Sequence, residues 1–180
     1  MVLHAPLRYL RPYVPVSGPE QTAPSDTASF HHGNHLITPL ANYRIQARVF
    51  GAERYRFDTM ADLIPVDLAL AWGDMAYPGR LKKIHARQSG RFLQYQFSEE
   101  SMDLSDDKIV CQVANTHCIP ATAEIRHTLL EVRPDDVIQA SGILVQVVFP
   151  GGGIVRSSLS RTDTGPGSCE VFFIRELTIE

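Results

Sequence analysis

Three residues that together can perform thiol chemistry lie in the second half of the chain: Asn115, His117 and Cys169. A cysteine reacts as the thiolate, so it needs a base that takes its proton and a third group that orients the base. Cysteine, histidine and asparagine form such a set and can lie far apart in sequence. One hypothesis is therefore a cysteine-dependent hydrolase or transferase with Cys169 as nucleophile, His117 as base and Asn115 as the orienting residue.

The segment just before Cys169 is rich in polar residues and glycine, which is typical of a tight loop. Its Arg161, Asp163 and Ser158 are candidate substrate-binding residues. The structural alternative is that Arg161 and Asp163 lock the loop by a charge-assisted hydrogen bond. Cys169 has a structural alternative too, because it opens an apolar stretch in which a free cysteine commonly serves as a small buried hydrophobe.

A second hypothesis is a small zinc-binding protein. Its donors would be either His31, His32 and His35, or His117 with the three cysteines, Cys111, Cys118 and Cys169. Imidazole and thiolate suit zinc. The chain has no C-x-x-C pair, however, and the H-x-x-H motif at His32 lies in a glycine-containing loop instead of on a helix. The sequence therefore predicts no metal site and no cofactor, with zinc as the alternative.

Two motifs resemble a family of uncharacterised bacterial proteins. They are N-x-H-x-I-P-A, at residues 115–121, and S-S-L-x-R-x-D-x-G-x-G-x-C-E, at residues 157–170. Residues 37–41 and 68–73 are similar as well, so the resemblance covers residues 36–179. Many such proteins begin with a membrane-anchoring segment, which this sequence does not carry, and Cys118 stands where the family usually has an aliphatic residue. The resemblance implies a site around the two motifs without naming a reaction.

The elements that must position these residues are best defined in the last third of the chain. A long β-branched strand is predicted over residues 137–149, a return strand over 154–159 and a closing strand over 169–179. Gly142 inside the long strand indicates a bulge or sharp coil of the kind that barrel strands need. We expect successive antiparallel strands, with the Asn115–His117 segment beside the last turn.

Other elements follow from local signals. Alternation predicts a strand over residues 43–50, followed by a turn at 51–52 and a partner strand over 53–57. Residues 62–73 are interpreted as a short helix, with Pro65 at its start and Gly73 at its end. Trp72 at its end is expected in the core. The remaining predictions are a hairpin around residues 88–91, a loop at 115–121 and a helix from the Thr122 cap to Val132.

Together these signals predict an α+β, β-rich fold: an antiparallel, partly closed barrel with two or three short helices, similar in pattern to the OB-fold. Residues 1–29 are expected to form a proline-rich tail or docking arm through which the chain could form a homo-oligomer. Residues 30–180 are expected to form one domain.

Composition limits the function. The chain has 180 residues, of which 44% are hydrophobic and 21% charged, and its net charge is −3. The sequence pI is about 6.1, which argues against general nucleic-acid binding. No apolar run is long enough to span a membrane. The chain is expected to be soluble, in the cytoplasm, or in the cell envelope if an anchor lies outside this sequence. The leading expectation is a non-catalytic binding or scaffolding domain for a protein or small ligand, and the resemblance suggests the bacterial envelope as its location. The thiol enzyme and the zinc protein are the alternatives.

Overall fold

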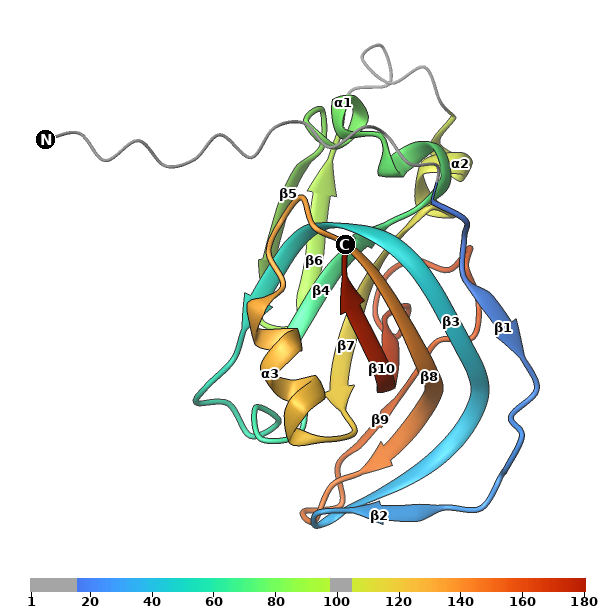
Figure 1. Cartoon of the computed structure of the whole chain (residues 1–180), viewed down its shortest axis with the longest axis vertical. Helices are drawn as coiled ribbons and strands as arrows, with labels where there is room; N and C mark the ends of the chain where they lie inside the picture. The colour runs from blue at the N-terminus through green and yellow to red at the C-terminus, as the bar shows by residue number, and fades with distance from the viewer. Residues whose placement is uncertain (1–15, 98–104) are drawn as a thin grey trace, which may run out of the picture.

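The computed structural model describes residues 16–97 and 105–180, and it is β-rich with few helices (Figure 1). The strands are β1 (Glu20–Thr22), β2 (Phe30–His32), β3 (His35–Arg54), β4 (Val66–Ala71), β5 (His85–Ser89), β6 (Phe92–Gln96), β7 (Val113–Pro120), β8 (Val137–Val148), β9 (Ile154–Arg156) and β10 (Glu170–Ile179). The helices are the 3₁₀-helix η1 (Gly73–Ala76) and the α-helices α1 (Pro78–Leu81), α2 (Asp106–Val110) and α3 (Ala123–Glu131). The α+β, β-rich class predicted from the sequence is confirmed.

Five of the strands form a ring. Around it, β3 pairs with β4, β4 with β7, β7 with β10 and β10 with β8, and β8 pairs with β3 to complete the circuit. All these pairs are antiparallel except β7 with β10, which is parallel. The sheet is therefore mixed, and the prediction of an antiparallel barrel is wrong for this pair. The strongly curved β3 and β8 are visible side by side in Figure 1. β5 and β6 form a separate hairpin.

Two apolar clusters pack against the two faces of this sheet. The larger one contains Leu68, Leu70 and Phe172 together with Leu129 of α3, so the helix closes one side of the ring. The second lies on the other face and includes Ile119, Val171 and Phe173. Because successive residues of a strand point to opposite faces, β4, β7 and β10 are apolar on both sides. The polar residues found within these strands are therefore exceptions that need partners.

Gly142 allows β8 and β10 to approach closely. It pairs with Ile174 of β10 and with Tyr43 of β3, and a register shift follows between Ile174 and Glu176. A Cβ atom at Gly142 would lie 2.1 Å from the carbonyl oxygen of Phe173. The irregularity predicted from this glycine is thus present, as a close backbone approach beside a β-bulge.

Two predictions for the middle of the chain are wrong. Residues 66–71 form the strand β4 instead of part of a helix, and residues 113–120 form the strand β7 instead of a loop. Both strands are buried on both faces, so they lack the alternation that marks a half-exposed strand. Pro65 and Gly73, taken as helix limits, lie just outside β4, and Gly73 has φ of 53°. Trp72 is buried in the larger cluster, as expected.

The prediction of a turn at residues 51–52 is also wrong. β3 continues through it to Arg54, with a register shift against β4 between Val49 and Gly51. The hairpin at residues 88–91 is confirmed, and so is the helix capped by Thr122, whose side chain accepts a hydrogen bond from the amide of Ile125. The strands predicted in the last third are confirmed as β8, β9 and β10, with β9 shorter than predicted.

Part of the predicted tail lies on the body. β1 pairs with β3, Val16 is buried, and the amide of Gly73 donates to the carbonyl oxygen of Val16. Residues 1–15, the rest of that prediction, lie outside the described residues. In the described ranges 16–97 and 105–180, no helix has the length and apolar character needed to cross a membrane.

Candidate functional site

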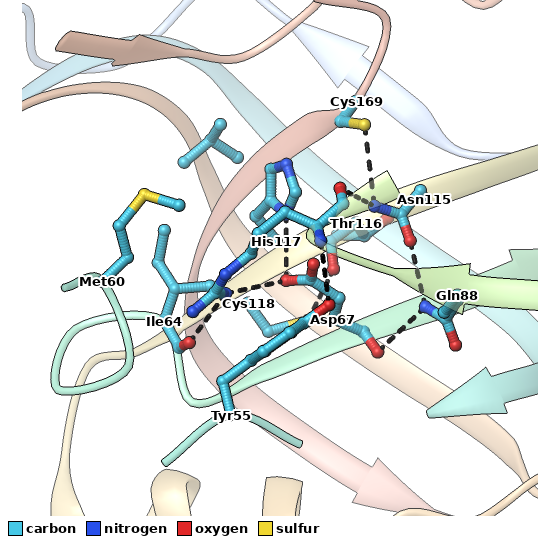
Figure 2. A network of polar contacts seen from close by, with 12 residues as sticks. Tyr55, Met60, Ile64, Asp67, Gln88, Asn115, Thr116, His117, Cys118 and Cys169 are labelled. Carbon is cyan, nitrogen blue, oxygen red and sulfur yellow. Dashed lines mark hydrogen bonds and ion pairs between the residues drawn. The ribbon is translucent and has the colours of Figure 1, made fainter. Parts of the chain in front are cut away.

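The parallel and antiparallel registers of three strands bring the candidate residues together. Asp67 of β4 lies opposite His117 of β7, and His117 lies opposite Val171 of β10. Cys169 is two residues before Val171, which places it on the same face as His117, at the entry of β10. Asn115 is two residues before His117 and shares that face. Figure 2 shows these residues as one polar network.

His117 has an acidic partner that the sequence interpretation did not include. Its Nδ1 atom lies 2.9 Å from Oδ1 of Asp67, and both side chains are nearly inaccessible to solvent. The contact has the distance but not the alignment of a hydrogen bond. Burial lowers the pKa of His117, but its interactions with Asp67 and Cys169 outweigh burial and raise that pKa to about 9. Asp67 therefore takes the orienting position that was predicted for Asn115.

The contact between His117 and Cys169 contributes to the raised pKa of His117. The Cys169 thiol is close enough to the imidazole to raise its pKa by a side-chain hydrogen bond and by charge. Because Nδ1 faces Asp67, Nε2 is the nitrogen left to face the thiol. Cys169, His117 and Asp67 thus come from segments that are distant in sequence but lie in one contact chain.

Arg91 at the turn of the β5–β6 hairpin holds Asp67 from the other side. Its Nη1 donates to Oδ1 of Asp67 at 3.2 Å and to the carbonyl oxygen of Ile64 at 2.9 Å. Its Nη2 pairs with Asp58 at 2.7 Å, and its guanidinium carbon lies 3.7 Å from the ring centroid of Tyr55. Oδ1 of Asp67 therefore lies within reach of both Arg91 and His117, so this buried side chain has a polar partner on each of two sides.

Asn115 directs its amide toward the sulfur. Its Nδ2 atom donates to the Cys169 Sγ at 3.6 Å and to the carbonyl oxygen of Arg91 at 3.2 Å, and its Oδ1 accepts from Nε2 of Gln88 at 3.0 Å. The same Gln88 nitrogen donates to the carbonyl oxygen of Asp67 at 3.2 Å. Because Gln88 occupies the oxygen end, the amide's N–H end is the one that faces Cys169.

A second polar group lies on the opposite face of the same strands. Glu170 is buried, it forms an ion pair with Arg161, and it accepts a hydrogen bond from Thr116 at 3.4 Å. Burial raises the pKa of Glu170 to about 7, although the Arg161 charge opposes the rise. Arg161 also donates to the Tyr43 hydroxyl at 3.4 Å. Burial, followed by the Glu170 charge, raises the pKa of Tyr43.

Asp163 and Ser158 hold the loop before Cys169. The Ser158 hydroxyl donates to Oδ2 of Asp163 at 2.7 Å, and the amide of Ser160 donates to that hydroxyl at 2.9 Å. The hydrogen bond predicted between Arg161 and Asp163 is therefore replaced by two separate contacts: Asp163 binds Ser158, and Arg161 binds Glu170. The side chain of Ser158 is turned toward the loop itself.

A cleft of about 290 Å³ lies between the β5–β6 hairpin, β7 and this loop. Cys169 and Asn115 lie in its wall, as do Arg161 and Asp163. Of the six site residues predicted from the sequence, Cys169, Asn115, Arg161 and Asp163 thus line the cleft. His117 lies beside Cys169 in the polar network, and Ser158 supports the loop. Cys169 is a partly exposed residue, so a molecule in the cleft would lie against it.

Sequence reasoning missed Asp67, Arg91 and Gln88. Asp67 is the only charged residue in Val66–Ala71, and it is fully buried. A lone carboxylate in a buried strand must have partners, which would have been a usable signal if the segment had been assigned as a strand. Arg91 has φ of 72° in the hairpin turn, a conformation that the sequence does not specify for arginine.

The donors considered for zinc are not gathered in one place. His117 and Cys118 are neighbours in β7, so they point to opposite faces, and burial, followed by the charge of Asp67, raises the pKa of the Cys118 thiol. Among the described residues, no three His, Cys, Asp or Glu side chains are arranged to hold a metal ion. Cys111, Cys118 and Cys169 are free thiols.

Comparison with known proteins gave no match for this chain among protein-family models, curated proteins or solved structures.

Proposed function

We propose that this protein is a cysteine-dependent acyl transferase or hydrolase, with Cys169 as the nucleophile. The observation that carries the proposal is the contact chain Cys169–His117–Asp67 beside a cleft that Cys169 lines. A buried histidine held by a carboxylate on one nitrogen and facing a thiol with the other is the arrangement that activates a cysteine.

Each residue has a role that its contacts support. His117 takes the thiol proton on Nε2, and Asp67 fixes the ring and stabilises the imidazolium. The Cys169 sulfur attacks the carbonyl carbon of an acyl donor, and the leaving group departs with a proton from His117. Water or a second acceptor then attacks the thioester, which returns the free thiol. Asn115 is placed to donate to the oxyanion that forms next to the sulfur.

The test compares the reactivity of Cys169 in the folded and unfolded protein. Native protein is treated with an excess of p-nitrophenyl acetate, and the acylated cysteine is located by peptide mass spectrometry. We expect selective acylation of Cys169 in the native state, at least about a hundredfold faster than for N-acetylcysteine methyl ester. The His117→Ala variant should lose the excess rate. If Cys169 reacts only after unfolding, the proposal is wrong.

A second candidate function, a non-catalytic binding domain, is favoured by the ring of strands. In chain order the five ring strands are β3, β4, β7, β8 and β10, and in space they follow one another as first, second, third, fifth and fourth. The third and fifth, β7 and β10, are parallel, and α3 connects the third to the fourth. We infer an OB-like barrel from this order, and OB-folds serve in many binding proteins. A protein or small ligand would then occupy the cleft, and Cys169 would show no excess reactivity.

The family resemblance is retained as part of the proposal. Both motifs that carry it contribute to the site: Asn115 and His117 come from the first, and Cys169, Arg161 and Asp163 from the second. An association with the bacterial cell envelope is likewise a proposal that rests on the resemblance alone.

A further inference from the structure

We propose that the acyl group taken up by Cys169 is uncharged, apolar and small, comparable to a benzoyl or hexanoyl group, and that it lies in the cleft beside the β5–β6 hairpin. This inference rests on the proposed function and adds the class of substrate to it.

Apolar side chains from several elements line the cleft. They are Trp72, Phe92, Leu93, Tyr95, Val110, Val113 and Pro166. Phe92 is 54% exposed although it is a large aromatic residue, so an apolar group bound in the cleft would remove part of its surface from water. An acyl chain attached to Cys169 would therefore find apolar surface within the same cavity.

The charged residues of the cleft are already paired. Arg161 pairs with Glu170, and Asp163 accepts from Ser158. Among the cleft residues that the structure describes, Arg161 is the only cation, and no lysine lines the cavity. A carboxylate or phosphate on the substrate would lose its hydration without gaining an unpaired cation, so a negatively charged acyl group is disfavoured.

The size of the cavity limits the acyl group. Clefts for drug-sized ligands range from about 300 to 1,000 Å³. The cleft here, with about 290 Å³, is just below that range. A single ring or a short chain fits this volume, and the long chain of a membrane lipid would extend out of it.

The test uses a series of p-nitrophenyl esters: acetate, butyrate, hexanoate, benzoate and the negatively charged hemisuccinate. In each reaction an S–C bond forms at Cys169, the ester C–O bond breaks and p-nitrophenolate leaves, so its absorbance reports the acylation rate. Each rate is divided by the rate of N-acetylcysteine methyl ester with the same ester, which removes intrinsic differences in reactivity. We expect the normalised rate to rise about tenfold or more from acetate to hexanoate or benzoate, and not for the hemisuccinate.

Two variants connect the preference to the cleft. Phe92→Ala should lower the hexanoate-to-acetate ratio about fivefold. Phe57→Ala removes an aromatic side chain that is 99% exposed and is not among the cleft residues, so its ratio should match that of the unmodified protein.

The outcomes separate this inference from the function on which it rests. If Cys169 is acylated selectively but the ratio is flat, or the hemisuccinate reacts best, the inference is overturned and the thiol chemistry stands. If Cys169 shows no excess rate with any ester, both are overturned.

Discussion

Oδ1 of Asp67 lies 2.9 Å from Nδ1 of His117, and the two residues are directly opposite each other on the paired strands β4 and β7. Strand pairing therefore brings these side chains next to each other, because residues opposite each other on one face have adjacent Cβ atoms. Arg91 adds a third charge at 3.2 Å from the same oxygen. Asp67 and His117 are both buried, whereas Cys169 and Asn115 line the cleft.

Asp67→Asn should slow acylation of Cys169 by about a hundredfold or more, because the amide no longer stabilises the imidazolium and can favour the wrong tautomer of His117. The measurement is the rate of p-nitrophenolate release, accompanied by a check of the fold by circular dichroism.

Asp58→Asn is the matched control for this variant. Asp58 also pairs with Arg91, but its contacts are with Arg91 and backbone amides, and its side chain is 37% exposed. We expect a change of no more than about threefold. Equal losses in the two variants would assign the effect to Arg91 and would contradict a direct role for Asp67.

Asn115→Ala should lower the acylation rate by about a hundredfold, because removal of one oxyanion donor has an effect of that order. Asn42→Ala removes an amide that binds residues 22–25 elsewhere on the surface and should leave the rate unchanged. An unchanged rate in Asn115→Ala would mean that the N–H aimed at the sulfur has no part in the reaction.

The sequence predicted the residues of the cleft better than the residues behind it. Cys169, Arg161 and Asp163 lie in or beside a polar segment that contains Gly165 and Gly167, where local loop signals are strong, and Asn115 and His117 stand out by their residue types. Asp67 falls inside the helix predicted over residues 62–73, two residues after Pro65, so its sequence context does not mark it as a site residue. β4 is buried on both faces, so its pattern is that of a short apolar run, which fits a helix or a strand equally well. Only the pairing with β3 and β7 distinguishes the two, and pairing is a long-range property.

The free energy of unfolding should fall as the pH rises from 6.5 to 9. The pKa of His117 is raised to about 9 from its ordinary value near 6.5, so the folded state binds a proton more tightly than the unfolded state. The resulting stabilisation is complete below pH 6.5 and is lost as the pH passes 9. Its upper limit is about 3 kcal/mol, since each unit of pKa difference corresponds to about 1.4 kcal/mol.

Urea unfolding at a series of pH values measures this dependence. His117→Gln should flatten the curve between pH 6.5 and 9. His127→Gln removes a histidine whose side chain is 79% exposed and should leave the curve as it is. A curve for His117→Gln that still falls by the full amount would contradict the linkage to this residue.

Arg161→Met should destabilise the protein more at pH 8 than at pH 5. The pKa of Glu170 is raised to about 7, so this buried carboxyl group is charged at pH 8 and mostly neutral at pH 5. At pH 8 the variant leaves a buried carboxylate without its cation, which should lower the free energy of unfolding by about 3 kcal/mol. At pH 5 the carboxyl group is mostly neutral and only a hydrogen bond is lost, so the free energy of unfolding should fall by about 1 kcal/mol. Thermal or urea unfolding at both pH values gives the difference.

Arg156→Met is the control. The Arg156 side chain donates to Gln146 on the surface, so its replacement should show the same small effect at both pH values. Equal losses at the two pH values for Arg161→Met would contradict the assigned ionisation of Glu170.

Gly142→Ala should destabilise the ring by about 3 kcal/mol or more, because a methyl group there would lie 2.1 Å from the carbonyl oxygen of Phe173. The clash is with backbone, so β8 and β10 must separate, and β10 leads directly from Cys169. Gly151→Ala is the matched control, since nothing lies within 4 Å of its added Cβ atom, and its effect should stay within about 0.5 kcal/mol. The unfolding free energies of the two variants test the ring, and the acylation rate of any folded Gly142→Ala protein tests its link to the site. A small effect on both would show that β8 and β10 tolerate a wider separation at this point and that the position of Cys169 does not depend on it.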